Sequence, residues 1–192
     1  MGKQELPLNQ LVEGCVLSDR KCEELLYKCF YGYLAGVAYR YIRERDVIRE
    51  LVNEAFLRIF KKIDRFAFDG PPEELEKAFK GWIGKIMANV VIDRLRSRKT
   101  LLYIEDMSKE QFKDIAIEMP DRLAYNDIIA LLDCLPPIQQ LIFNLYEIEG
   151  FSHSEIAKRL NMSASSSRVY LSRSKIKLMA CYRHLMETSY GR

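Results

Sequence analysis

The chain has 192 residues, of which 48% are hydrophobic and 30% charged, and its formal net charge is only +3. This composition predicts a globular protein of one large or two small domains, with ample apolar material for helical cores. The longest uncharged apolar stretch, between Lys28 and Arg40, is too short to span a bilayer. Residues 1–7 carry charge with no apolar core after them, so we expect no secretory signal and no membrane insertion, and a soluble cytoplasmic protein.

The cysteines are odd in number, and no two of them have the CxxC spacing of a zinc or redox motif. Three of them are spaced by sevens, which on one helix separates neighbours by roughly 10 Å, too far to share a metal ion. We therefore expect idle thiols in a reducing cytosol, with a thiol switch as an alternative that no pattern favours. The five are Cys15, Cys22, Cys29, Cys134 and Cys181.

The first half of the chain begins with a leader over residues 1–19, in which apolar spacing predicts one short amphipathic helix. From Arg20 to Ile42, adjacent apolar pairs recur every four residues and predict a long amphipathic helix. A charged break over 43–46 precedes a second helix with the same pairing over 47–60. Its polar face is expected from composition alone to be solvated charge, and consists of Arg49, Glu50, Asn53, Glu54 and Arg58.

A third helix is predicted over 79–99, after a loop over 64–72 that contains the turn Asp69-Gly70-Pro71. Its apolar face, which we expect to include Trp82, is buried. Basic charge with aromatic neighbours suits single-stranded nucleic acid, because bases stack on rings while phosphates bind cations. Of the charged residues over 77–99, Asp93 alone is acidic, and the polar face holds Lys80, Lys85, Asn89, Arg94, Arg96, Arg98 and Lys99.

Residues 100–121 change character, since acidic residues dominate and the apolar pattern weakens, so we expect a linker between two domains. A helix over 122–135 follows. Pro136 and Pro137 then begin another helix, which reaches Leu145 and is stopped before Gly150. No segment has the pattern of a strand. The predicted fold is all-α, with two small helical domains at 20–99 and 122–192.

Residues 150–178 have the pattern of a helix-turn-helix. Ser152 and Glu155 form a Ser-x-x-Glu capping box at the start of its first helix. A turn at 161–163 follows, in which Ser163 can cap the second helix. We expect Val169, Ile176 and Met179 to face inward on that helix.

Charge on this element favours DNA. Between Lys158 and Arg183 there is no acidic residue, and the early positions of the second helix are small, which lets a helix sit deep in a major groove. The alternative is a helical hairpin with a solvated basic face. The seven basic residues are Lys158, Arg159, Arg168, Arg173, Lys175, Lys177 and Arg183.

Three blocks, in this order, resemble the bacterial RNA polymerase sigma factors of the compact extracytoplasmic-function (ECF) type. The first is similar to the segment that docks on the polymerase clamp and reads VIRELVNEAFLRIFKKIDRF (47–66). The second is similar to the minus-ten-reading helix and reads FKGWIGKIMANVVIDRLRSRK (79–99). The third is similar to the minus-thirty-five-reading domain and reads LPPIQQLIFNLYEIEGFSHSEIAKRLNMSASSSRVYLSRSKIKL (135–178).

The resemblance implies a transcription initiation factor whose partners are the clamp and flap regions of core polymerase and promoter DNA, both duplex and melted, and often an anti-sigma protein. It implies clamp contacts at Leu51, Asn53, Glu54 and Arg58, minus-ten contacts by Asn89, Arg94 and Arg96, and minus-thirty-five contacts by Ser165, Ser166, Arg168 and Arg173. The charge pattern of the same faces adds Glu50 to the clamp set, Lys80, Lys85 and Arg98 to the minus-ten set, and Lys175 to the minus-thirty-five set.

Two segments depart from the family pattern. The loop over 69–78, which in the family captures a flipped base, is bulky and acidic here. Ser165, Ser166 and Ser167 stand where a Gly-Thr-Val-like sequence is usual, and Tyr170 where a basic residue is common. Neither the captured base nor the minus-thirty-five sequence therefore follows from the resemblance.

Two other classes of protein compete with this interpretation. A stand-alone helix-turn-helix regulator with a sensing or dimerisation domain would have no need of the basic helix at 79–99. An enzyme would need a phosphate loop, a metal-ligand spacing or a nucleophile with a base, and the two histidines, His153 and His184, complete none of these. We expect no enzyme, no metal and no cofactor.

Overall fold

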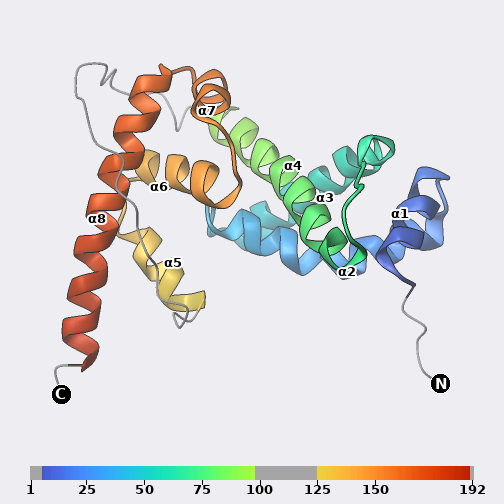
Figure 1. The fold of residues 1–192 in the computed structure, drawn as a ribbon, viewed down its shortest axis with the longest axis horizontal. Coiled ribbons are helices and arrows are strands. Elements are labelled where there is room, and N and C mark those ends of the chain that lie inside the picture. Colours follow the sequence, from blue (N-terminus) through green and yellow to red (C-terminus); the bar gives the residue numbers. More distant parts are fainter. Residues whose placement is uncertain (1–5, 98–124, 191–192) are drawn as a thin grey trace. The chain divides into compact units, whose positions relative to one another are not determined.

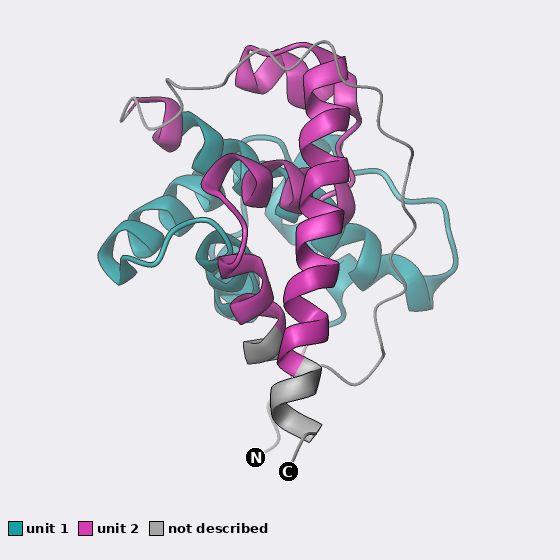
Figure 2. Cartoon of the chain, turned by 90° about the vertical axis from the view of Figure 1, so that its left-hand side faces the viewer, with its two compact units in different colours: residues 1–93 teal, residues 94–192 magenta. Residues whose placement is uncertain are grey.

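A computed structural model describes residues 6–97 and 125–190, with the backbone alone for 125–127 and 186–190 (Figure 1). Every regular element in these ranges is a helix, which confirms the predicted all-α fold. The chain divides into two compact units, unit 1 with residues 1–93 and unit 2 with residues 94–192 (Figure 2). The predicted linker at 100–121 lies outside the described residues. Within the described ranges, no helix is both long and apolar enough to cross a membrane.

Unit 1 is built from α1 (Leu8–Val16), α2 (Arg20–Tyr39), α3 (Arg45–Phe60) and most of α4 (Leu75–Ser97). The side chain of Asp19 caps α2 by accepting hydrogen bonds from the backbone N–H groups of Lys21 and Cys22, at 2.7 and 3.3 Å. The apolar pairs predicted from the sequence meet in one core and exclude water from each other. Its largest fully buried side chains include Leu26, Leu34, Val52, Ile59, Phe79, Ile83 and Met87.

Helix α4 begins four residues before its predicted start. A short 3-10 turn, Pro72–Glu74, leads directly into it, so the acidic residues expected to form a separate turn lie at its N-terminal end. Carboxylates are favourable there because the N-terminal end of a helix carries partial positive charge. The segment predicted as a loop over 64–72 is non-helical as expected, apart from the ends of two short 3-10 turns, Ile63–Arg65 and Pro72–Glu74.

Unit 2 contains α5 (Tyr125–Asp133), α6 (Pro137–Phe143), the π-helical turn Asn144–Ile148, α7 (His153–Leu160) and the long α8 (Ala164–Tyr190). The helices α5, α6 and α7 all contact α8, which is the spine of the unit (Figure 1). Gly150 ends the π turn with a φ of +68°, a conformation that glycine adopts without a steric penalty.

Four serines of α8 have almost no exposed surface. Their small side chains allow neighbouring helices to approach closely, and Ser174 Oγ lies 2.7 Å from the carbonyl oxygen of Tyr170 and 3.0 Å from that of Gln139 on α6. These hydrogen bonds satisfy a hydroxyl whose burial would otherwise cost free energy. The four are Ser166, Ser167, Ser172 and Ser174.

Two core predictions need correction. Ile176 was expected to face inward, but 47% of its surface is exposed, so the inward prediction is wrong; the buried stripe of α8 passes through Leu171 and Leu178 instead. Trp82 is only half-buried: it packs by its ring on Phe66 and Phe79 and keeps part of its surface in solvent. Val169 is buried as predicted.

Candidate nucleic-acid interface

The predicted capping box opens α7. The backbone N–H of Glu155 donates to Ser152 Oγ at 3.3 Å, and the backbone N–H of Ser152 donates back to Glu155 Oε2 at 2.8 Å. Two otherwise unpaired amides of the helix start are thereby satisfied, which fixes where α7 begins. Asn161 then ends α7 in the left-handed conformation, with φ 54° and ψ 50°. The predicted turn at 161–163 is confirmed.

Ser163 caps α8 as the sequence predicted. Its Oγ accepts a hydrogen bond from the backbone N–H of Ser166 at 3.0 Å and lies 2.7 and 2.8 Å from the hydroxyls of Ser166 and Ser165. A short tract of serines therefore holds the first turn of α8 in place. Rigid helix starts of this kind position side chains in a major groove.

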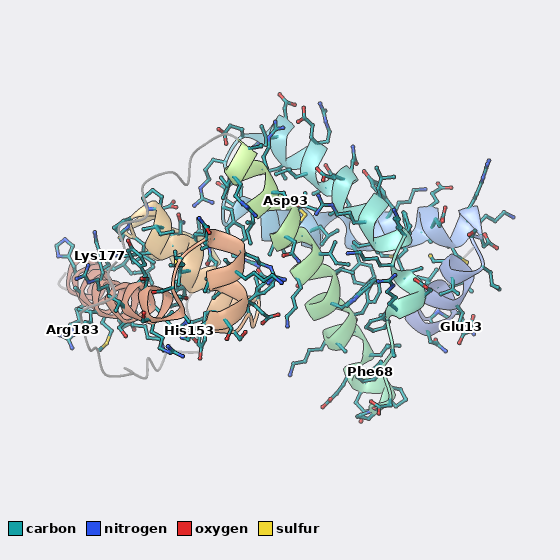
Figure 3. All side chains as sticks on the ribbon, turned by 90° about the horizontal axis from the view of Figure 1, so that it is seen from above. Glu13, Phe68, Asp93, His153, Lys177 and Arg183 are labelled. Atoms are coloured by element: carbon teal, nitrogen blue, oxygen red, sulfur yellow. The ribbon has the colours of Figure 1, made fainter. Side chains whose placement is uncertain are left out.

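The structure separates the residues of α8 that the sequence placed on one face. Ser165 and Arg168 are exposed and Arg173 is half-buried, whereas Ser166 has no exposed surface and belongs to the cap. Lys175 Nζ pairs with Glu147 Oε1 at 2.8 Å, and only 14% of the Lys175 side chain is exposed. The exposed cations of the helix also include Lys177 and Arg183, labelled in Figure 3.

Two aromatic contacts fix α7 and its preceding turn within unit 2. His153 stacks on Tyr146 with ring centroids 4.3 Å apart, and its Nδ1 lies 2.9 Å from the hydroxyl of Ser167 on α8. The guanidinium of Arg159 lies over the Phe151 ring, 4.6 Å from its centroid. These contacts place His153 in a supporting position between the two helices of the motif.

On α4, a polar stripe follows the four-residue repeat that aligns side chains on one helix face. Lys77, Lys85 and Arg96 are exposed along it, and Asn89 is half-buried and donates from Nδ2 to the Lys85 carbonyl oxygen at 2.8 Å. A side chain added at Gly81, also on this stripe, would meet no atom within 4 Å, so the surface is open there.

The other predicted residues of α4 differ in environment. Lys80 Nζ pairs with Glu76 at 2.5 Å and lies over the ring of Tyr33, 5.8 Å from its centroid. Arg94 is half-buried. Arg98 lies outside the described residues. Of the predicted α4 cations that the structure describes, Lys85 and Arg96 are exposed, whereas Lys80 and Arg94 are partly buried.

An aromatic cluster supports the N-terminal half of α4. Phe66 lies 5.1 Å from Phe79 and 5.4 Å from Trp82, measured between ring centroids. The ring of Phe68 covers Gly70, because a Cβ at that glycine would come within 2.6 Å of it. Figure 3 shows Phe68 in the loop at one end of α4 and Asp93 on the helix itself. Phe66 and Phe68 lie in the loop before α4, whereas Phe79, Trp82 and the cations lie on α4 itself.

The predicted clamp residues of α3 also divide. Glu50, Asn53 and Glu54 are exposed, with Asn53 Oδ1 accepting a hydrogen bond from the Tyr27 hydroxyl at 2.9 Å, whereas Leu51 is 3% exposed and lies in the core. Leu57, which the sequence analysis did not single out, is 71% exposed on the same side. The sequence could have indicated this exposure, because Leu57 falls outside the repeat of adjacent apolar pairs that a core leucine would follow.

Arg58 joins α3 to α4. Its guanidinium pairs with Glu54 at 2.6 Å and with Asp93 at 2.8 Å. Partial burial alone lowers the pKa of Arg58, but hydrogen bonds to Asp93 and Glu54 outweigh it and raise that pKa above its ordinary value. The arginine therefore links α3 to α4 at the edge of the exposed face of α3.

Two family models match the chain, and together they span more than half of it. Residues 26–100 match the model described as Sigma-70 region 2, and residues 125–178 match the model described as Sigma-70, region 4. The protein belongs to the sigma-70 family. Region 2 takes in most of α2 and all of α3 and α4, while region 4 takes in α5 to α7 and the first half of α8.

Relatives of this sigma factor carry related names. A probable RNA polymerase sigma factor of Haemophilus influenzae is 26% identical over 73% of this chain and 79% of its own length. The ECF RNA polymerase sigma-E factor of Escherichia coli K12 is 24% identical over 90% of this chain and 94% of its own. Other matched relatives are longer, and the chain spans about half of their length. Their names support the ECF type.

A solved structure of the sigma factor RpoE with the anti-sigma factor NepR, from Bartonella quintana, aligns with 83% of this chain and 96% of its own. The TM-score is 0.48 and the sequence identity 18%. The two family models and the names of the relatives confirm the predicted family and nucleic-acid-binding class, and the all-helical architecture confirms the fold class. This sigma factor directs RNA polymerase to promoters, and the stand-alone regulator is not favoured.

Proposed function

We propose that this sigma factor divides its contacts among three surfaces: the first turns of α8 for duplex, the stripe of α4 for the melted strand, and the exposed face of α3 for the polymerase. The observation that carries the proposal is the separation of buried from exposed polar residues on each helix. A surface that binds a partner must offer exposed side chains.

For the minus-thirty-five element, Ser165 and Arg168 are the residues we assign to the duplex. Both are exposed within the first turns of α8, where a recognition helix meets base edges. An arginine there can bind guanine through two hydrogen bonds or bind a phosphate. Arg173 is a candidate phosphate contact. Ser166 and Lys175 act as positioning residues, the first through the cap and the second through its pair with Glu147.

For the minus-ten element, Lys77, Lys85, Asn89 and Arg96 form the proposed track for the melted strand. The cations Lys77, Lys85 and Arg96 follow one another at intervals of eight and eleven residues, about two and three helical turns, so they can bind separate phosphates along the strand. The nearby aromatic cluster suits unstacked bases. Phe66 and Phe68 are half-buried, so each keeps some ring surface exposed.

For the polymerase, Glu50, Asn53, Glu54 and Leu57 form the proposed clamp face. Carboxylates give charge complementarity with a basic partner, and the exposed leucine that follows them on α3 gives apolar area to bury. Unit 2 would supply the contact with the flap. The resemblance to the family alone supports an anti-sigma partner, a role restricted to initiation rather than catalysis, and a location with RNA polymerase in the cytoplasm.

Reconstitution with purified polymerase core tests the assignment. We expect the protein to bind core and to start transcripts at fixed promoter sites, with footprints at both elements only when core is present. A stand-alone regulator would instead give a specific footprint without core, and that result would overturn the proposal.

The clamp face has its own test. Leu57→Ser should weaken core binding roughly tenfold, because an exposed apolar contact is lost while the fold is untouched. Leu17→Ser, at a leucine 82% exposed after α1, is the matched control and should leave core affinity unchanged. Equal affinity of both variants would remove Leu57 from the interface.

A further inference from the structure

Two cysteines that are far apart in the sequence meet in unit 2. Cys134 directly follows α5, Cys181 lies on α8, and the side chain of Cys181 interacts with the Cys134 thiol. The Cys134 thiol also lies 3.6 Å from the carbonyl oxygen of Ala130, to which it donates. No motif in the sequence joins the two positions.

The two cysteines lie near a cavity where α5 contacts α8. Leu131 and Leu178, each three residues before one of the cysteines, line the same cavity of about 350 Å³. Helices α5 and α8 therefore stay close from the cavity to the thiol pair. In a disulfide the sulfurs are about 2.05 Å apart, so the two interacting thiols must move closer together to join.

Solvent reaches this pair, in contrast to another thiol. Cys134 is exposed and Cys181 is partly buried. Cys15 is 3% exposed, and burial, with the nearby Cys22, Glu23 and Asp19, raises its pKa to about 12, so its thiol is unreactive near neutral pH. Soluble oxidants should therefore reach the α5–α8 pair more readily than Cys15.

We propose that Cys134 and Cys181 form a reversible disulfide, which makes unit 2 a target of peroxides and of low-molecular-weight disulfides. With hydrogen peroxide, the Cys134 thiolate attacks one oxygen, an S–O bond forms, the O–O bond breaks, and the leaving hydroxide takes up a proton as water. The Cys181 thiolate then attacks the sulfenic sulfur, an S–S bond forms, the S–O bond breaks, and a second water leaves. The two thiols lose two electrons and the peroxide gains them.

The reaction should be faster at alkaline pH. The hydrogen bond with Cys181 and burial raise the pKa of Cys134, and the nearby charge of Lys177 offsets this only in part. Because the thiolate is the nucleophile, a raised pKa leaves little reactive form at neutral pH. Oxidation should therefore accompany sustained rather than brief exposure to oxidant.

The crosslink would close a loop that contains α6, α7 and the start of α8. It restricts the unfolded chain and pins the short α5 to α8, so unit 2 should become more resistant to unfolding. Arg168 lies 13 positions before Cys181 on the same helix, about 20 Å away along its axis. The proposed duplex-binding residues should remain available in the oxidised protein.

Peptide mapping of the oxidised full-length protein tests the proposal. After treatment with hydrogen peroxide, alkylation and digestion without reductant, we expect one dominant linked peptide joining Cys134 to Cys181. The intact mass should fall by two hydrogen atoms and return with dithiothreitol. The thermal midpoint of unit 2 should rise by several degrees, and amide exchange in α5 should slow.

Serine variants complete the test. Cys134→Ser and Cys181→Ser should each abolish the linked peptide and the thermal shift, and the thermal midpoints of the reduced variants show whether they remain folded. Cys29→Ser, at an exposed thiol of α2, is the matched control and should change neither result. Disulfide-linked dimers, linkage spread over the other cysteines, or the same thermal shift in Cys134→Ser would overturn the proposal.

Discussion

Helices α4 and α8 have similar sequences in one respect, since both carry a basic face and an apolar face, but their surroundings differ. Around α8, serine caps and buried serines fix the first turn, and one basic residue, Lys175, is consumed by an ion pair inside the unit. Along α4, the cations of the stripe stay exposed, and an aromatic cluster lies beside them. A helix start held rigidly suits the reading of duplex edges, whereas an open track of charge with rings suits a flexible strand.

The largest expected effect on stability comes from removing a buried side chain of α7 in the helix-turn-helix. Ile156 is fully buried between the helices of the motif, and Ile156→Ala should destabilise unit 2 by about 2–5 kcal/mol through lost burial and a cavity. Urea unfolding would measure the loss, and duplex capture should fall with it. Ser154→Ala, at an exposed position of α7, is the control. If Ile156→Ala weakened binding to single-stranded DNA as strongly as duplex capture, the two regions would not act separately.

The next effect separates the two basic surfaces directly. Arg168→Ala should reduce promoter capture by about 1–3 kcal/mol, roughly 5- to 150-fold, and leave transcription from an artificially melted template nearly normal. Lys85→Ala combined with Arg96→Ala should allow closed complexes and deplete open ones. Promoter binding and transcription on duplex and bubbled templates measure both.

Equal failure of these variants on both templates would contradict the division between α4 and α8. It would mean instead that the two helices form one continuous duplex-binding surface. Lys85 and Arg96 are chosen in preference to Arg94, because Arg94 is half-buried and its loss would also change packing.

A smaller effect sharpens the role of the caps. Ser152→Ala removes the hydroxyl of the capping box and should destabilise unit 2 by about 1 kcal/mol. Ser152→Asn, which keeps an N-cap acceptor, should restore most of that stability. Thermal or urea unfolding distinguishes them. An alanine variant as stable as the asparagine variant would show that tertiary packing, not capping, fixes the start of α7.

The smallest effect concerns α4. Asp93→Asn weakens a partly exposed pair with Arg58 and should change stability by less than about 1 kcal/mol. It also removes an acidic side chain from the helix proposed to follow the strand, so binding to single-stranded DNA should strengthen slightly, and more at low salt. Titration with single-stranded DNA at two salt concentrations measures this. Weaker binding would show that Arg58 must be held by Asp93 for the strand to bind.

Much of the architecture follows from the sequence. The repeat of apolar pairs predicted α2 and α3 closely, because a period near 3.6 fixes a helix whatever its partner. The capping box at Ser152 and the cap at Ser163 were also predictable, since a cap involves neighbours three residues apart. The family was indicated by three sequence blocks that resemble those of the ECF sigma factors in the same order.

The tertiary structure decided which side of each helix is buried. Ser165 and Ser166 are adjacent and chemically identical, yet one is exposed and the other buried, because only the partner helices determine which direction is inward. For the same reason Ile176 is exposed and Leu57 stands in solvent. Arg58 with Asp93, and Cys134 with Cys181, are pairs between distant segments, and no local pattern encodes such contacts since they arise only when separate helices pack together.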